Sequence, residues 1–131
     1  MSNVPADLRY TKSHEWLRTL PDGNVEVGIT DHAQEALGDL VFVEVPEAGR
    51  TLKAGESCAV VESVKAASDV YAPIACTVIG GNPQLASEPE AINKDPYGSG
   101  WLMRIRPGSP AEVAALLSAA EYTSFLAAEG E

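Results

Sequence analysis

The chain has 131 residues, enough for one domain with its own hydrophobic core, and 45% of them are hydrophobic. Nineteen acidic against nine basic residues give a formal net charge of −10, which disfavours binding to nucleic acid or to an anionic membrane surface. Apolar runs stay short of the roughly 20 residues that span a bilayer, and the N-terminus lacks the pattern of a signal peptide. We therefore expect a cytoplasmic protein, or a mitochondrial matrix protein if the chain is a processed eukaryotic form.

The first two-thirds of the chain is predicted to be β-structure. Residues 25–29 alternate apolar with other side chains, and the turn sequence at 21–24 pairs them with the preceding strand in a hairpin. The Gly-rich sequence at 80–82 is expected to end a later strand. Short strands at intervals of about 8–12 residues are typical of a sandwich or barrel. The expected strands are 14–20, 25–29, 40–45, 57–62, 68–72, 74–79 and 101–105.

Helices are predicted in two places. Residues 31–38 carry a capping box, with Asp31 as the cap and Gln34 three residues later, and Gly38 stands where a left-handed C-terminal cap belongs. A second helix is predicted to begin at Ser109, with proline in its first position and a glutamate that completes the box. Its apolar stripe consists of Val113, Leu116, Leu117 and Ala120.

Cysteine and histidine usage argues against several kinds of site. Cys58 and Cys76 are too few for a disulfide framework and are expected to be free thiols. His14 and His32 do not have the spacing of a metal-binding motif, so the sequence predicts neither a metal site nor a catalytic residue.

Lys65 is the most informative residue. It lies between two predicted strands with small neighbours, Val64 and Ala66, so we expect it at the tip of a tight hairpin. A long amine at such a tip is accessible to a modifying enzyme, while Glu62 and Asp69 flank it and can position it or offer a recognition charge. Spacing alone also fits an exposed turn lysine without a role.

Five stretches in order resemble the H-protein family of the glycine cleavage system, and the resemblance covers the chain from residue 10 to about residue 125. One stretch is YTKSHEW; another, ESVKAASDVYAP, contains Lys65. The stretches are 10–16, 28–39, 41–44, 62–73, and 95–98 with 100–102.

The resemblance implies a mainly β fold: a lipoyl/biotinyl-type β-sandwich (hybrid barrel-sandwich) with a short N-terminal extension and C-terminal helices at 109–131, all in a single domain of residues 1–131. It implies that Lys65 carries lipoate through an amide. The chain is then a non-catalytic carrier that takes the aminomethyl group of glycine from glycine decarboxylase (P protein) to aminomethyltransferase (T protein) for one-carbon metabolism. Dihydrolipoamide dehydrogenase (L protein) reoxidises the arm, and a lipoate-attaching enzyme loads it. An exposed arm fits a monomer.

The family's loaded arm folds back into a surface cleft. By motif, Ser13, Glu15 and Asp69 are expected to contact the aminomethyl amine, because a protonated amine prefers anionic, hydrogen-bonding partners. His32 and Ile29 are expected to line the same cleft. One departure concerns Cys76, which occupies a position where the family usually has glycine, so packing near Cys76 is expected to differ locally.

Other functions fit the lysine less well. Biotin carriers favour methionine on both sides of the lysine, whereas this chain has Val64 and Ala66. The lipoyl module of 2-oxo acid dehydrogenases is shorter and lacks counterparts of 10–16 and of the C-terminal helix. An enzyme that forms a Schiff base on Lys65 would normally bury that amine. A small β domain with only a protein-interaction role remains the alternative outside the carrier class.

Overall fold

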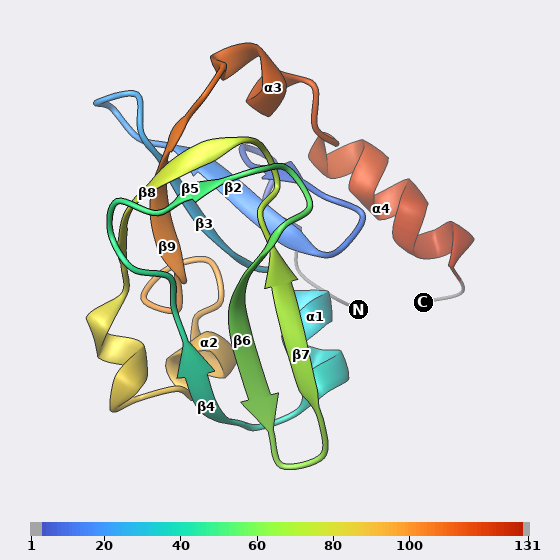
Figure 1. Ribbon diagram of the computed structural model, residues 1–131. Helices are drawn as coiled ribbons and strands as arrows, with labels where there is room; N and C mark the ends of the chain where they lie inside the picture. Colours follow the sequence, from blue (N-terminus) through green and yellow to red (C-terminus); the bar gives the residue numbers. More distant parts are fainter. Residues whose placement is uncertain (1–3, 130–131) are drawn as a thin grey trace.

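The computed structural model describes residues 4–129 (Figure 1). The strands are β1 (Arg9–Tyr10), β2 (Glu15–Thr19), β3 (Val25–Ile29), β4 (Leu40–Glu44), β5 (Thr51–Leu52), β6 (Ser57–Ser63), β7 (Ala67–Tyr71), β8 (Cys76–Gly81) and β9 (Met103–Pro107). The helices are α1 (Asp31–Leu37), the 3-10 helix η1 (Pro83–Ala86), α2 (Ala91–Lys94), α3 (Pro110–Ala114) and α4 (Ala119–Ala128).

Within the described residues the strands form two antiparallel sheets that share one core. The larger has the order β1-β2-β3-β9-β8-β5 and the smaller the order β4-β6-β7. Val27 and Ile105 of the first sheet are buried with Val61 and Val70 of the second. The alternating patterns in the sequence therefore predicted the correct class, a mainly β sandwich, because each strand turns one apolar face toward the other sheet.

The predicted end of a strand at residues 80–82 was wrong, because β8 continues through Gly81. A Cβ atom on Gly81 would overlap the side chain of Val45. Glycine here permits a close approach of two segments and does not end the strand. The last strand begins at Met103, two residues later than predicted, so Trp101 precedes it and is half-buried.

Cys76 is the first residue of β8 and pairs with strands on both sides. It lies opposite Leu52 of β5 and Pro107 of β9 and is buried in the shared core. Both cysteines of the described chain are free, as predicted. Burial raises the pKa of Cys58 to about 12 and that of Cys76 to about 11, so both thiols stay protonated and unreactive at neutral pH.

The cap of α1 differs from the predicted one. Thr30 is the N-cap, and its hydroxyl accepts a hydrogen bond from the Ala33 backbone at 3.3 Å. Asp31 is the first helical residue and accepts a bond from the side chain of Gln34 at 2.7 Å. Thr30 is fully buried, so its short side chain turns to the helix end instead of toward solvent. Gly38 ends the helix with φ 85°, as its position indicated.

The single helix predicted from residue 109 is two helices. Ser109 and Pro110 do begin α3, but α3 ends at Ala114, and within the described chain the Ser109 side chain forms no capping hydrogen bond. The capping box lies at the start of α4, where the Ser118 hydroxyl accepts from the Glu121 backbone and the Glu121 carboxylate accepts from the Ser118 backbone. The predicted segment also includes residues 130–131, which lie outside the described residues.

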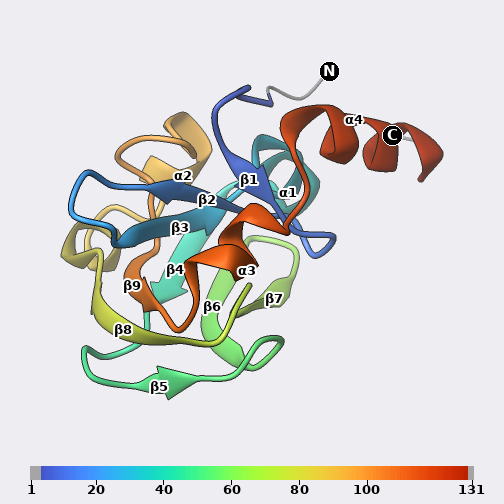
Figure 2. The same ribbon diagram turned by 90° about the horizontal axis from the view of Figure 1, so that it is seen from above.

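The backbone of Leu117 explains the break. Its N–H donates to Tyr10 at 3.0 Å and its carbonyl accepts from Tyr10 at 2.9 Å, so it cannot join a helical ladder. The predicted stripe is split as a result: Val113 packs in the shared core, and Leu117 packs in a second cluster under α4. Figure 2 shows α4 beside β1, where the rings of Tyr10 and Tyr122 stack with centroids 4.7 Å apart.

Gly28 of β3 packs against Trp16, a member of the second cluster. A Cβ atom there would lie 2.7 Å from indole atoms of the fully buried Trp16. We expect Gly28→Ala to lower the free energy of unfolding by about 1–3 kcal/mol, because the indole has no space to move. The urea midpoint measures this. Gly80→Ala is the matched strand control, since a Cβ atom there has no heavy atom within 4 Å. Equal midpoints for the two variants would contradict the packing argument.

Candidate functional site

Lys65 is exposed at the tip of the β6–β7 hairpin, as predicted (Figure 1). Ser63 holds the turn: its backbone N–H donates to the Ala66 carbonyl at 2.7 Å, and its hydroxyl accepts from the Lys65 and Ala66 N–H groups at 3.2 and 3.1 Å. The N–H of Val64 donates to the Asp39 carbonyl at 3.2 Å, which ties the tip to the segment before β4. The backbone is therefore fixed while the lysine amine remains free to project.

The stem of Lys65 lies against the end of α1. A Cβ atom on Gly38 would be 3.3 Å from Lys65 Cε, so the glycine leaves room for the lysine side chain. The amine thus leaves the hairpin beside α1, the helix that carries His32.

A buried carboxylate lies at the start of β2. Glu15 is only 2% exposed, and its Oε1 accepts hydrogen bonds from the hydroxyls of Thr11 and Ser13, each at 2.5 Å. Its Oε2 accepts from the backbone N–H of Tyr71, at the end of β7, at 3.4 Å. Burial is the largest influence and raises the pKa of Glu15 above its usual value, although these hydrogen bonds act against it. Glu15 is therefore a buried hydrogen-bond acceptor, held by three donors close under the surface.

A cavity of about 340 Å³ is lined in part by Thr11, Ser13 and Tyr71, the three residues that donate hydrogen bonds to this carboxylate. One wall is the segment from Tyr10 to Ser13, which contributes two of the hydroxyl groups on or near Glu15. The other walls are Tyr71 to Pro73, with Gly55, and the link between α3 and α4. The cavity is therefore bordered by β7, the strand that leads from the lysine tip.

The residues predicted for the cleft fall into two groups. Ser13 is hydrogen-bonded to Glu15, and Ile29 lies opposite Glu15 in the β2–β3 register. Neither His32, on α1, nor Asp69, on β7, is among the described residues that line the cavity. The His32 ring on α1 is 4.7 Å from that of His14, and Asp69 is exposed on β7, two residues before Tyr71 and on the same face of the strand. Of these predicted residues, Ser13 is hydrogen-bonded to Glu15. His32 and Asp69 are located only by the helix and the strand that carry them.

The family model for the glycine cleavage H-protein matches residues 8–129. The chain belongs to this family. A relative named glycine cleavage system H protein, from Halorhodospira halophila, is 63% identical over 130 residues, which are 99% of this chain and 100% of the relative. One from Aromatoleum aromaticum is 58% identical over 97% of this chain and 98% of its own. The crystal structure of a glycine cleavage system H protein from Mycobacterium marinum superposes with a TM-score of 0.85 at 46% identity, covering 95% and 99% of the two chains.

Membership in the H-protein family confirms the predicted fold class and the carrier role in glycine cleavage, and it makes the chain a carrier component and not a catalyst. Two further findings on residues 4–129 concern membrane-spanning helices and metal-binding groups. None of the helices there is long and apolar enough to cross a membrane. Histidine, cysteine and acidic side chains in that range do not gather in any group of three or more that could hold a metal ion.

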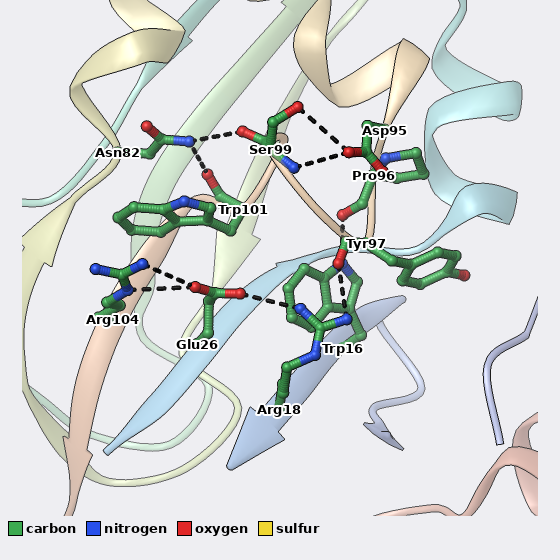
Figure 3. A network of polar contacts seen from close by, with 10 residues as sticks. All are labelled: Trp16, Arg18, Glu26, Asn82, Asp95, Pro96, Tyr97, Ser99, Trp101 and Arg104. Carbon is green, nitrogen blue, oxygen red and sulfur yellow. Dashed lines mark hydrogen bonds and ion pairs between the residues drawn. The ribbon is translucent and has the colours of Figure 1, made fainter. Parts of the chain in front are cut away.

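Figure 3 shows Pro96 and Tyr97, from the family stretch 95–98, beside Trp16 and Arg18 of β2. The Trp16 indole N–H donates to the Pro96 carbonyl at 2.9 Å, and Arg18 donates to the Tyr97 carbonyl at 2.7 Å. The Tyr97 hydroxyl accepts from the backbone N–H of Asp31 at 2.9 Å. The loop therefore joins β2, which carries Glu15, to the start of α1. Arg18 is itself held by Glu26 at 3.1 Å.

Thr11 and the Tyr71 backbone are the contacts of Glu15 that the sequence did not indicate. Thr11, Ser13 and Glu15 are spaced two residues apart, and in a regular strand that spacing would place the three side chains on one face. It was not decisive because a turn intervenes, in which His14 has φ 72°. Tyr71 is 56 residues from Glu15, so only the packing of the two sheets brings it there.

Proposed function

We propose that Lys65 is the lipoyl attachment site and that the chain, as one carrier domain, moves the aminomethyl group of glycine from the P protein to the T protein, with the L protein reoxidising the arm. The observation that carries this is the position of Lys65: an exposed amine on a rigid hairpin tip, in a chain of the glycine cleavage H-protein family. The lipoyl group supplies a disulfide that accepts the aminomethyl carbon on sulfur.

The length of the arm suits the distance to Glu15. A lipoyl-lysine reaches on the order of 15 Å. Ala67–Tyr71 spans roughly 13 Å at about 3.3 Å per residue, and Tyr71 contacts Glu15. An arm folded back along β7 would bring its end group to the cavity beside Glu15.

The cleft residues then have separate tasks. The ionised Glu15 would accept from the protonated amine, and Ser13, which is exposed and bonded to Glu15, would orient it. Asp69 adds negative charge on the exposed face of β7. The side chains of Ile29 and His32 would exclude water. Glu62, three residues before Lys65, is proposed to serve the lipoate-attaching enzyme as a recognition charge.

Intact-mass analysis tests the attachment. Protein isolated from lipoate-replete cells should carry one lipoyl increment, and peptide mapping should place it on Lys65. Lys53, another exposed lysine in a turn, is the internal control and should be unmodified. Protein from cells that cannot make or take up lipoate should lack the increment. A biotin increment, or an unmodified Lys65 in lipoate-replete cells, would refute the proposal.

A further inference from the structure

Three exposed apolar side chains gather next to the lysine. Val41 is 55% exposed, Phe42 49% and Val64 72%. Side chains alternate along a regular strand, so neighbours such as Val41 and Phe42 normally point to opposite faces. Here the β4–β6 register shifts between Leu40 and Phe42, and both neighbours are exposed while Leu40 and Val43 are buried. Because of this irregularity, Val41 and Phe42 both point to solvent, although one of them would face the core in a regular strand.

These side chains, which we call the tip patch (Val41, Phe42 and Val64), are continuous with the hairpin tip. Phe42 lies opposite Glu62 in the β4–β6 pair. Val64 is the neighbour of Lys65, and its N–H is bonded to the Asp39 carbonyl just before β4. Figure 1 shows the start of β4 beside the hairpin tip, at the same end of the molecule.

The rim of the tip patch is acidic. Asp39 and Glu44 are exposed on either side of Val41 and Phe42, and Glu62 is half-buried across from Phe42. The whole chain carries −10. An apolar centre with an acidic rim complements a partner surface that has an apolar depression bordered by Lys or Arg.

We propose that the tip patch is the docking surface for the enzyme that attaches the lipoyl group, an inference that rests on the proposed function of Lys65. To form the amide, the deprotonated Lys65 Nζ attacks the carbonyl carbon of an activated lipoyl acyl donor held by that enzyme. The N–C bond forms, the activating group leaves with its electron pair, and the nitrogen loses a proton to base.

The attaching enzyme differs from the P, T and L proteins in how close its reacting atoms must come to Lys65. The reacting carbonyl must come within about 3–3.5 Å of Nζ, so the attaching enzyme has to cover the hairpin tip. The P, T and L proteins act at the end of an arm on the order of 15 Å long and can engage it from other faces. Val64 adjoins Lys65, and Val41 and Phe42 lie on the strand paired with β6. An enzyme that covers the hairpin tip would therefore contact the tip patch.

The test is the steady-state kinetics of lipoylation of the purified, unmodified chain by a lipoate-attaching enzyme. We expect Phe42→Ser to raise the KM for the chain by about tenfold or more with little change in kcat, because an aromatic side chain at the centre of an interface contributes strongly to affinity. Val64→Ser, at the most exposed position, should also raise KM, and it cannot disturb the core. Ile79→Ser is the matched control: it removes an exposed apolar side chain from β8, in the other sheet, and should stay within about twofold of wild type.

A second measurement separates docking of the attaching enzyme from docking in general. Phe42→Ser, fully lipoylated by prolonged incubation with excess enzyme, should be loaded by the P protein and, after chemical reduction of the lipoyl disulfide to the dithiol, reoxidised by the L protein, both at wild-type rates. If these rates fall as much as lipoylation does, the tip patch is a common partner surface and the proposal is overturned. A wild-type KM for both Phe42→Ser and Val64→Ser overturns it as well. Failure of the wild-type chain to be lipoylated overturns the proposed function, and this inference with it.

Discussion

Replacing Lys65 with arginine is expected to abolish glycine cleavage in a system reconstituted from the P, T and L proteins. Arginine keeps the positive charge and nearly the same reach, but its guanidinium stays protonated and is not acylated. The tip itself should not change, since its hydrogen bonds come from Ser63 and from backbone groups and not from the lysine side chain. Release of carbon dioxide from carboxyl-labelled glycine measures the loss, which should reach the background without carrier.

Lys53→Arg is the matched control for this experiment. Lys53 is also an exposed lysine in a turn, and its substitution should leave both lipoylation and glycine cleavage at wild-type levels. Urea midpoints of both variants should equal that of wild type, because neither side chain is buried. Cleavage activity that survives Lys65→Arg above background would show that the covalent arm is not on this residue.

Local patterns predicted the parts of the fold that depend on neighbours in sequence. The alternation at Val25, Val27 and Ile29 placed β3, and small residues around Lys65 indicated the hairpin tip, because both follow from side-chain period and turn chemistry. The resemblance to the H-protein family then supplied Ser13 and Glu15, which the structure joins by a hydrogen bond.

Two of the errors share one cause, a contact between segments distant in sequence. The helix expected from Ser109 breaks because the backbone of Leu117 pairs with Tyr10, more than 100 residues away. Gly81 stays in its strand because Val45 packs over it. Neither partner can be identified from a window of the sequence, and the same holds for the backbone N–H of Tyr71 on Glu15.

Removing the charge of the buried Glu15 carboxylate is expected to shorten the lifetime of the loaded carrier. Glu15→Gln keeps the shape of the side chain and removes its charge, so a protonated amine in the cleft would lose a charge-assisted hydrogen bond and keep a neutral one. That difference is about 1.4 kcal/mol, or about tenfold in rate. We therefore expect the aminomethyl group to be lost from the loaded, isolated carrier about tenfold faster, as measured by the release of formaldehyde or ammonia. Glu88→Gln, at an exposed position, should decay at the wild-type rate.

The stability of the same variant distinguishes protection of the cargo from loosening of the fold. Burial raises the pKa of Glu15 in the folded state, so folding favours its protonated form. The contribution of this residue to stability is therefore fully present below the unfolded pKa and is lost as pH rises through the raised folded value. Glutamine does not titrate, so the free energy of unfolding of Glu15→Gln, relative to wild type, should increase as pH rises through that window.

The variant is then expected to release its cargo faster while its stability relative to wild type rises with pH, a combination that partial unfolding does not produce. An unchanged decay rate would exclude Glu15 as the partner of the amine. Faster decay together with a lower urea midpoint at neutral pH would assign the effect to the fold instead. The expected pair of results would mean that the chain keeps an ionised carboxylate under its surface, against its own stability, because the cargo requires that charge.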